Sequence, residues 1–408
     1  MKLQLSLLSV GLALAVHAAG PQISNVTYAQ DGHSRKVTVT YKLTGAAAVV
    51  TMDVQTNGVS IGEAIVNRAL DGDVNRRVAC GDDDRTITWY PERAWPGHRV
   101  DGNCRVVLKA WPLSSPPDIL AVDLRDGRTF YYTSTNAVPE EGNVQARKYK
   151  TDYMVFRKIP AAGVRWRMGA PDGDSEKGTN EDCHWVTLTR DYYMAIYECT
   201  QAQLRKLKTD SSSFSVDRET RPAENVKHDT LRGGVGKTSW PTSRNVSSDS
   251  VVGILQARSG LAFDLPTEAQ WEYACRAGTS TPRYSDAGIG LLARYLGNSS
   301  KGVVEDKDII NCDTTKGTAA VGMYLPNAWG LYDMLGNVTE KCRDRYAEHL
   351  GTSEVVDPKG DATAENWVAK GGCWRDPASF CRASYRGYYS WTDSYMSRGF
   401  RLCLELGE

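Results

Sequence analysis

The clearest metal-binding pattern in this sequence is a pair of carboxylates that flank a glycine. Asp333 and Glu340 lie seven residues apart, with Gly336 and Val338 between them. A glycine lets the backbone turn so that carbonyl oxygens face inward between the two side chains. Hard oxygen ligands in an irregular loop suit Ca²⁺. These four residues could form a structural calcium site, but short motifs of this kind more often mark an ordinary turn that carries a solvated acid, so the pattern alone leaves both interpretations open.

Cysteines are the second group that could do chemistry, and all ten lie downstream of residue 20. Cys80 and Cys104 stand apart from the others and enclose a loop of about 25 residues. A disulfide across a loop of that length stabilises a fold by roughly 3 to 4 kcal/mol. We therefore predict a Cys80–Cys104 bond in an oxidising compartment. The sequence leaves open how the remaining cysteines pair, among them Cys183, Cys199, Cys312, Cys342 and Cys403.

Other catalytic classes lack the residues they need. The five histidines after residue 20 are widely spaced, without the short His-x-x-x-His or His-x-Glu patterns of metal sites, and neither a nucleophile elbow nor a phosphate loop is present. Acidic and basic residues balance at 49 each, with no basic cluster. Nucleic acid and anionic membranes are therefore poor candidate partners.

Composition along the chain predicts two domains behind an export signal. A charged start, an apolar run up to Val16 and the string Val16-His17-Ala18 predict a signal peptide over residues 1–19, and hence a secreted or periplasmic protein without a membrane span. Alternating apolar residues and polar turns predict an all-β, immunoglobulin-like sandwich over residues 20–112. Residues 113–151, rich in proline, predict a linker with one added strand.

Residues 152–408 predict an α+β domain with little regular secondary structure. Thr200 and Thr267 are each followed three residues later by glutamine, the spacing of a capping box, so helices are expected to begin after both. Residues 211–250 are rich in serine and glycine and predict a surface loop. The rest of the domain is rich in glycine, tryptophan and tyrosine without clear periodicity. Such a domain needs disulfides, ions or aromatic packing to hold its loops.

Seven strings in this domain, in order, resemble the formylglycine-generating enzyme (sulfatase-modifying factor) family. They begin at Met168-Gly169 and Tyr197-Glu198-Cys199-Thr200-Gln201, and continue with the strings at residues 265–274 (LPTEAQWEYA), 326–340 (PNAWGLYDMLGNVTE), 371–374 (GGCW), 382–386 (RASYR) and 399–401 (GFR). The resemblance implies a C-type-lectin-like fold with a shallow peptide-binding groove. It also implies calcium at the Asp333 to Glu340 loop.

The same resemblance implies copper chemistry that this chain is not expected to perform. Family members oxidise a substrate cysteine at two cysteines, five positions apart, that hold Cu(I). Counting forward from Gly371-Gly372, these positions fall on Asp376 and Cys381. Counting backward from Arg386, Cys381 matches neither position, and the family instead implies its disulfide with Cys275. Cys373 is then the remaining candidate for a relocated ligand, so neither it nor Cys381 is a confident catalytic residue.

Taken together, the sequence predicts a secreted recognition module that lacks the copper-binding pair. A ligand groove is expected at Trp374, Tyr385 and Arg386, with an extended peptide, an exported sulfatase or a glycan as partner. The aromatic residues up to Tyr395 are equally consistent with binding and with core packing. The alternative is an oxidase that converts a sulfatase cysteine to formylglycine with copper and O₂. The number of free thiols in the groove separates the two.

Overall fold

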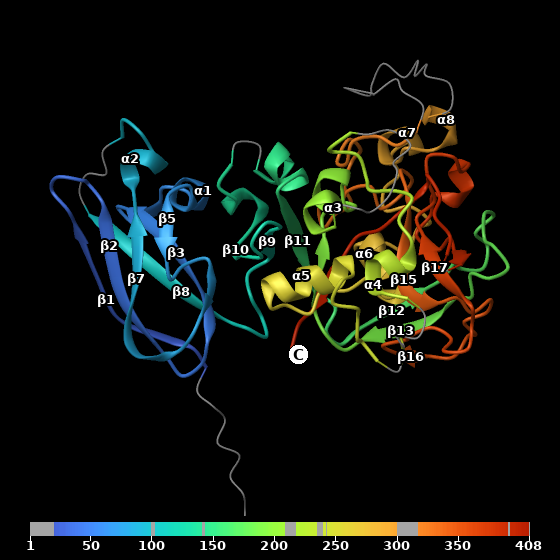
Figure 1. Cartoon of the computed structure of the whole chain (residues 1–408), viewed down its shortest axis with the longest axis horizontal. Helices are drawn as coiled ribbons and strands as arrows, with labels where there is room; N and C mark the ends of the chain where they lie inside the picture. Colours follow the sequence, from blue (N-terminus) through green and yellow to red (C-terminus); the bar gives the residue numbers. More distant parts are fainter. Residues whose placement is uncertain are drawn as a thin grey trace, which may run out of the picture.

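The computed structural model describes residues 20–98, 103–140, 143–208, 218–234, 240–241, 243–299, 317–390 and 392–407. The predicted signal peptide and Cys312 lie outside the described residues. An N-terminal sheet-rich unit occupies one end of the molecule and a larger C-terminal unit the other (Figure 1). Over the described ranges, no helix is long and apolar enough to cross a membrane.

The N-terminal unit is built from two sheets that share one core. One sheet has the order β1 (Gln22–Gln30), β2 (Val37–Thr44), β7 (Gly81–Trp89), β5 (Leu70–Gly72); the other consists of β4 (Val59–Ser60), β3 (Ala48–Thr56) and β6 (Arg76–Val78), with β8 (Cys104–Pro112) also paired to β3. Tyr41 of β2 and Met52 of β3 pack into the same cluster. Two short helices, α1 (Glu63–Asn67) and α2 (Pro91–Ala94), complete the unit. The unit is rich in strands, as expected, and the immunoglobulin-like sandwich arrangement stays a prediction.

The segment predicted as a linker is part of a five-stranded sheet. It supplies two strands, where one was expected: β9 (Ile119–Asp123) and β10 (Thr129–Tyr132). The sheet has the order β10, β9, β11 (Tyr153–Ile159), β14 (Tyr192–Ala195), β20 (Cys403–Glu405). Three 3₁₀ turns, η1 (Thr135–Ala137), η2 (Asn143–Gln145) and η3 (Arg147–Lys150), follow β10. The segment therefore belongs structurally with the C-terminal unit.

Two further sheets of short strands complete the C-terminal unit. In the first, β13 (His184–Leu188) pairs antiparallel with β12 (Val164–Met168) and parallel with β16 (Val355–Val356). The second has the order β18 (Gly387–Ser390), β17 (Asn366–Lys370), β15 (Thr339–Arg345), β19 (Arg398–Gly399). Long irregular segments join these strands, as the sequence predicts. The C-type-lectin-like description of this arrangement stays a prediction.

Both helices that the capping boxes predicted are present. They are α3 (Gln201–Leu207) and α6 (Glu268–Arg276), and in each the threonine hydroxyl accepts a hydrogen bond from the third backbone amide of the helix. Four other helices were not predicted: α4 (His228–Arg232), α5 (Val251–Ser259), α7 (Ile289–Leu292) and α8 (Leu296–Ser299). The first of these lies inside the segment expected to be loop. The signal for α5 was available, since Ser250 caps its start and Gly260 ends it in a left-handed conformation.

Helix α6 places charged residues inside the protein. All nine of its residues are buried, including Glu268, Glu272 and Arg276 beside the apolar Trp271 and Ala274. Buried charges are tolerated only when they are paired and hydrogen-bonded. The partners therefore have to come from loops that pack around the helix, and these loops form the candidate site.

Candidate functional site

A small surface pocket of about 270 Å³ lies where the β17–β18 connection passes over its sheet. Its walls are formed by residues that include Cys373, Asp376, Tyr385, Arg386, Tyr388 and Arg398. The connection leaves β17 through Gly371 and Gly372, whose φ angles are 92° and 70°. A side chain on Gly372 would lie 2.8 Å from the carbonyl oxygen of Phe380. Glycine is thus required for the tight turn that returns the loop to the pocket.

Two thiols, Cys373 and Cys381, and the Asp376 carboxylate lie on the connection from β17 to β18. Asp376 lines the pocket, and its Oδ2 accepts a hydrogen bond of 3.0 Å from the backbone amide of Cys373. Burial and the nearby Asp376 carboxylate raise the pKa of the Cys373 thiol to about 12. Cys381 is fully buried behind the pocket, and burial raises the pKa of its thiol as well. Without a bound metal both thiols are neutral, and Asp376 places a hard oxygen where the family resemblance implies a soft thiolate ligand.

The predicted groove residues separate into two groups. Tyr385 and Arg386 line the pocket, as expected. Trp374 does not line it: its ring is buried and its indole N–H donates to the carbonyl oxygen of Met396 at 3.1 Å. The inclusion of Trp374 was therefore wrong, because a buried indole needs a hydrogen-bond acceptor and finds it inside the protein.

The aromatic residues between Tyr385 and Tyr395 include both buried and exposed rings. Tyr389 is buried against Trp367, whereas Tyr388 and Tyr395 are 56% and 50% exposed. Phe380, 38% exposed, stacks on Tyr385 with ring centroids 4.5 Å apart. Phe380 lies on the connection from β17 to β18, Tyr388 lies on β18, and the Tyr395 ring lies 4.7 Å from Arg398 of the pocket wall, so the pocket has an apolar rim. Trp391 lies outside the described residues.

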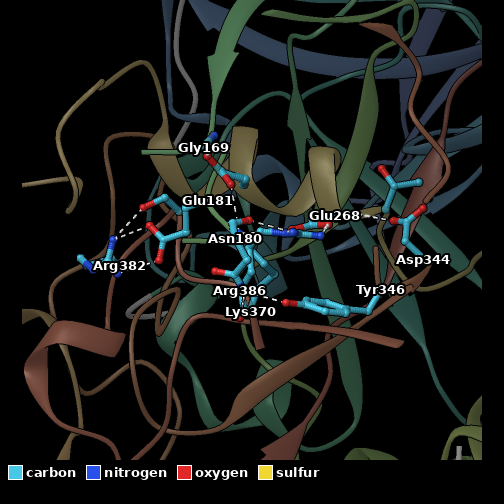
Figure 2. Close-up of polar contacts among 12 residues, drawn as sticks. Gly169, Asn180, Glu181, Glu268, Asp344, Tyr346, Lys370, Arg382 and Arg386 are labelled. Carbon is cyan, nitrogen blue, oxygen red and sulfur yellow. Dashed lines mark hydrogen bonds and ion pairs between the residues drawn. The ribbon is translucent and has the colours of Figure 1, made fainter. Parts of the chain in front are cut away.

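Beneath the pocket, a network of buried ion pairs holds the loop to α6. Figure 2 shows Arg386 and Lys370 below the helix that carries Glu268, with Arg382 paired to Glu181 at one side. Arg386 donates from Nε to Glu268 Oε1 at 2.6 Å and from Nη2 to Oε2 at 3.1 Å. Glu268 occupies the first turn of the helix, where the helix dipole favours a negative charge.

The remaining donors of these arginines are also occupied. Arg386 Nη1 donates to the carbonyl oxygens of Asn180 and Glu348 at 2.8 and 3.1 Å. Arg382 makes two 2.7 Å bonds to Glu181 and one of 2.6 Å to the carbonyl oxygen of Ser379. Bidentate pairs of this kind fix geometry as well as charge. Arg386 therefore holds its own segment to α6 and to the loops at Asn180 and Glu348. Its charge is already neutralised by Glu268.

The predicted calcium loop lies next to the same helix. Asp333 and Glu340 are both buried, and Arg401 contacts the two of them: it donates to the carbonyl oxygen of Asp333 at 3.4 Å and from Nε to Glu340 Oε2 at 2.6 Å. Glu340 also accepts from the indole N–H of Trp271 at 2.8 Å. The sequence analysis missed Glu198, whose carboxylate accepts bonds from the Asn337 side chain and the Val338 amide.

These contacts leave one carboxylate oxygen of the loop open. Asp333 Oδ2 accepts from the Gly322 amide at 2.6 Å, while Oδ1 is enclosed without a hydrogen-bond partner in the described chain. Burial raises the pKa of Asp333 to about 6. Glu340 is already compensated by Arg401, and no group of three metal-ligating side chains arranged around a common point occurs among the described residues. The unpartnered Oδ1 of Asp333 could therefore bind a cation, whereas the carboxylate of Glu340 is already bonded to Arg401. Calcium binding by all four residues stays a prediction.

No disulfide is present among the described cysteines, and the Cys80–Cys104 and Cys275–Cys381 pairings stay predictions. All nine described cysteines are free thiols. Cys104 lies in β8 opposite Thr56 of β3, and Cys80 lies in the connection from β6, which also pairs with β3, to β7 of the other sheet. Cys275 directs its thiol toward the carbonyl oxygen of Met334 at 3.8 Å, and Cys381, which follows the η4 turn (Ala378–Phe380), packs in the same core cluster.

Comparison with known proteins finds relatives of the C-terminal unit. The chain is 34% identical to the formylglycine-generating enzyme of Mus musculus over 143 residues, which cover 34% of this chain and 38% of that protein. It is 27% identical to the chaperone protein LppX of Paenibacillus barcinonensis over 240 residues, which cover 53% of this chain and 81% of that protein. The match to the mouse enzyme thus spans about two fifths of its length.

Solved structures and the family assignment concern the same unit. PvdO from Pseudomonas aeruginosa is 22% identical, with a TM-score of 0.48, and the match covers 62% of this chain and 94% of that chain. Residues 145–406 match the sulfatase-modifying factor enzyme 1-like domain, described as FGE-sulfatase. This match covers more than half of the sequence and includes every residue of the pocket, the ion-pair network and the Asp333 loop. The chain therefore belongs to the sulfatase-modifying factor enzyme 1-like family.

Proposed function

We propose that the family domain of this protein is a non-catalytic recognition module that binds an extended peptide of an exported protein at the Cys373–Arg398 pocket. The observation that carries the proposal is the donor set of the pocket. Asp376 stands in the pocket wall, and Cys381 is buried behind it. Copper oxidation as the family resemblance implies it needs two thiolates facing one substrate, because Cu(I) selects soft ligands.

The rim of the pocket supports binding through side chains. Tyr388, Tyr395 and Phe380 expose aromatic rings around a floor that the Glu268–Arg386 pair keeps rigid. Aromatic anchors on a rigid surface contribute most of the affinity in typical peptide and protein interfaces. A peptide strand is not expected to extend the sheet at β18. Arg398 donates to the Tyr388 carbonyl oxygen and Asp393 accepts from the Ser390 amide, so the outward backbone groups of this edge are taken.

A peptide is favoured over a glycan by two features. Two of the charged side chains of the pocket, Arg386 and Asp376, already bond to the protein itself and are less available to sugar hydroxyls. One relative of similar domain length is named a chaperone, a class of protein that binds polypeptides. Export of the protein is part of the proposal, because its N-terminal residues have the form of a secretory signal.

The oxidase remains a second candidate because of one observation. Cys373 lies close enough to Cys381 to contribute to the raised pKa of the Cys381 thiol. A metal ion that displaced both protons would bring two sulfurs to one point. This arrangement would use a relocated ligand, Cys373, which lines the pocket.

Peptide display tests the proposal directly. Random peptides selected on the full chain are counter-screened against Tyr388→Ala, and binding of the enriched peptides is measured by fluorescence anisotropy. We expect at least a fivefold loss of affinity in Tyr388→Ala and none in Tyr28→Ala, which removes a comparably exposed tyrosine, 48% against 56%, from the N-terminal unit. Failure to enrich peptides, or equal binding by both variants, would refute peptide recognition at this pocket.

An activity assay tests the second candidate. Copper-loaded protein is incubated with O₂ and a cysteine-containing sulfatase peptide, and the peptide mass is followed. We expect no aldehyde. Aldehyde formation that disappears in both Cys373→Ser and Cys381→Ser would establish the oxidase and contradict the non-catalytic proposal.

A further inference from the structure

A second cavity lies where the N-terminal unit meets the five-stranded sheet. Its volume is about 450 Å³, which falls within the roughly 300 to 1,000 Å³ of small-molecule sites. Both units contribute walls: β5 and β6 with their connection on one side, and the β9–β10 hairpin, η3 and the start of β11 on the other. Domain interfaces are preferred positions for such sites. The cavity is separate from the Cys373–Arg398 pocket and shares no residue with it.

The side of the cavity formed by the C-terminal unit is an aromatic wall. Phe130 and Tyr153 meet edge to face with centroids 6.3 Å apart, and Tyr153 meets Tyr149 in the same way at 5.7 Å. Cations lie at both ends of the wall, Arg128 6.0 Å from the Phe130 ring and Lys148 5.0 Å from the Tyr149 ring. Mutual packing of the rings keeps the wall rigid. It therefore offers a preformed surface on which an apolar ring face can stack.

Polar groups in the cavity lack protein partners. Tyr132 and Tyr149 are buried to 6% and 2% exposure, and neither hydroxyl forms a hydrogen bond with the described part of the chain. Asn75 donates to Asn67 Oδ1 at 2.7 Å, but its own Oδ1 accepts no bond there. Buried polar groups are nearly always satisfied by protein, water or ligand. These two hydroxyls and the amide oxygen can therefore bind the hydroxyl groups of a ligand.

Most of the cationic side chains in the cavity wall form ion pairs with carboxylates, but one does not. Arg76 pairs with Asp73 at 3.2 Å, Arg128 pairs with Asp126 at 2.8 Å, and Lys148 pairs with Glu140. Arg77, by contrast, forms no ion pair with a carboxylate among the described residues; the acidic side chain of the lining, Asp71, accepts a hydrogen bond from the Gly72 amide at 2.8 Å. A guanidinium presents a planar set of donors that matches a carboxylate. The N-terminal wall thus carries one cation available to an anionic ligand.

We infer that this interdomain cavity binds an acidic saccharide of the uronic-acid class. The ring face of the sugar stacks on the Phe130–Tyr153–Tyr149 wall, its hydroxyls bond to Asn75 and Tyr132, and its carboxylate pairs with Arg77. A saccharide combines an apolar ring face with several hydroxyls, which is the combination that this cavity matches. A phosphorylated peptide would use the charge of Arg77 but leave the hydroxyl-binding groups unmatched.

Calorimetric titration of the full chain tests the assignment. The probes are tetrasaccharides of galacturonate, glucuronate and mannuronate, each with its methyl ester, and a phosphotyrosine peptide. We expect at least one uronate to bind, its ester to bind at least tenfold more weakly, and the phosphopeptide to bind less well than the uronate. Absence of binding by all uronates, equal binding of acid and ester, or tighter binding of the phosphopeptide would overturn the assignment.

Variants locate the site and separate it from the peptide pocket. Arg77→Gln should weaken uronate binding at least tenfold, and Tyr132→Phe, which removes one hydroxyl, about fivefold. Arg105→Gln is the matched control, since Arg105 is exposed on the same unit outside the cavity. Tyr388→Ala should leave uronate binding unchanged. Unaltered binding in Arg77→Gln, or a loss in Arg105→Gln equal to it, would exclude this cavity as the site.

Discussion

Replacing Glu272 by glutamine should remove the charge on which the centre of the C-terminal unit depends. Glu272 is completely buried in α6 and accepts four hydrogen bonds: from Arg276 Nε and Nη2 at 3.0 and 2.7 Å, from Lys370 Nζ at 3.0 Å, and from the Gly169 amide at 2.9 Å. Glutamine keeps the shape of the side chain. It leaves the charges of Lys370 and Arg276 buried with less compensation.

The magnitude follows from the pKa of this carboxyl. Its burial acts to raise the pKa, but Lys370 and Arg276 outweigh this effect and hold it at about 2, against an ordinary value of 4.5. At about 1.4 kcal/mol per pH unit, the difference amounts to roughly 3 kcal/mol of folding free energy. Breaking a buried ion pair by removing one partner costs about 3 to 5 kcal/mol. Both routes therefore predict a loss of about 3 kcal/mol in Glu272→Gln.

The pH dependence gives this prediction a distinct signature. Because the folded-state pKa is depressed, the stabilisation is fully present above pH 4.5 and is lost as the pH falls toward 2. A protonated glutamate has the shape and neutrality of glutamine. The stability curves of the natural protein and of Glu272→Gln should thus differ by about 3 kcal/mol at pH 6 and converge near pH 2.

Urea unfolding followed by tryptophan fluorescence, repeated between pH 2 and 7, measures both quantities. Glu365→Gln is the control, because Glu365 is exposed and should change stability by less than about 0.5 kcal/mol. A loss below about 1 kcal/mol at pH 6 would refute the reasoning. So would a difference that stays constant down to pH 2, because it would show that shape and not charge is responsible.

Three further changes probe the helix start, a buried lysine and the pocket thiol. Thr267→Ala removes the cap that accepts from the Gln270 amide at 3.1 Å and should lower the free energy of unfolding by about 1 kcal/mol, measured in urea. Burial lowers the pKa of Lys341 to about 7, so stability should rise with pH between about 7 and 10.5 in the natural protein, and Lys341→Met should abolish this rise in the same titration. Cys373, with a pKa of about 12, should resist iodoacetamide at pH 7 in the folded state, as followed by mass spectrometry; rapid alkylation there would contradict a neutral, buried thiol.

Local signals in the sequence predicted local structure correctly. The Thr200 and Thr267 capping boxes form as expected, because the hydroxyl and the amide that bond lie three residues apart on one chain. The alternation of β2, with every second residue buried after Thr38, likewise reflects a two-residue period that needs no distant partner to be recognised. The second strand of the supposed linker, β10, was missed because Phe130 to Tyr132 are apolar without alternation and gain their burial from β9.

The sequence by itself determined the family and the absence of a thiol at position 376, because each depends on residue type and order. Tertiary structure decided which groups face each other. It turned Trp374 into the interior and gave the Glu340 carboxylate to Arg401. Pairings of this kind join residues that are far apart in the chain. They depend on the backbone path of the intervening segments, which a local sequence pattern does not reveal. The interdomain cavity arises in the same way, since its aromatic wall and Arg77 come from different units that meet only in the folded protein.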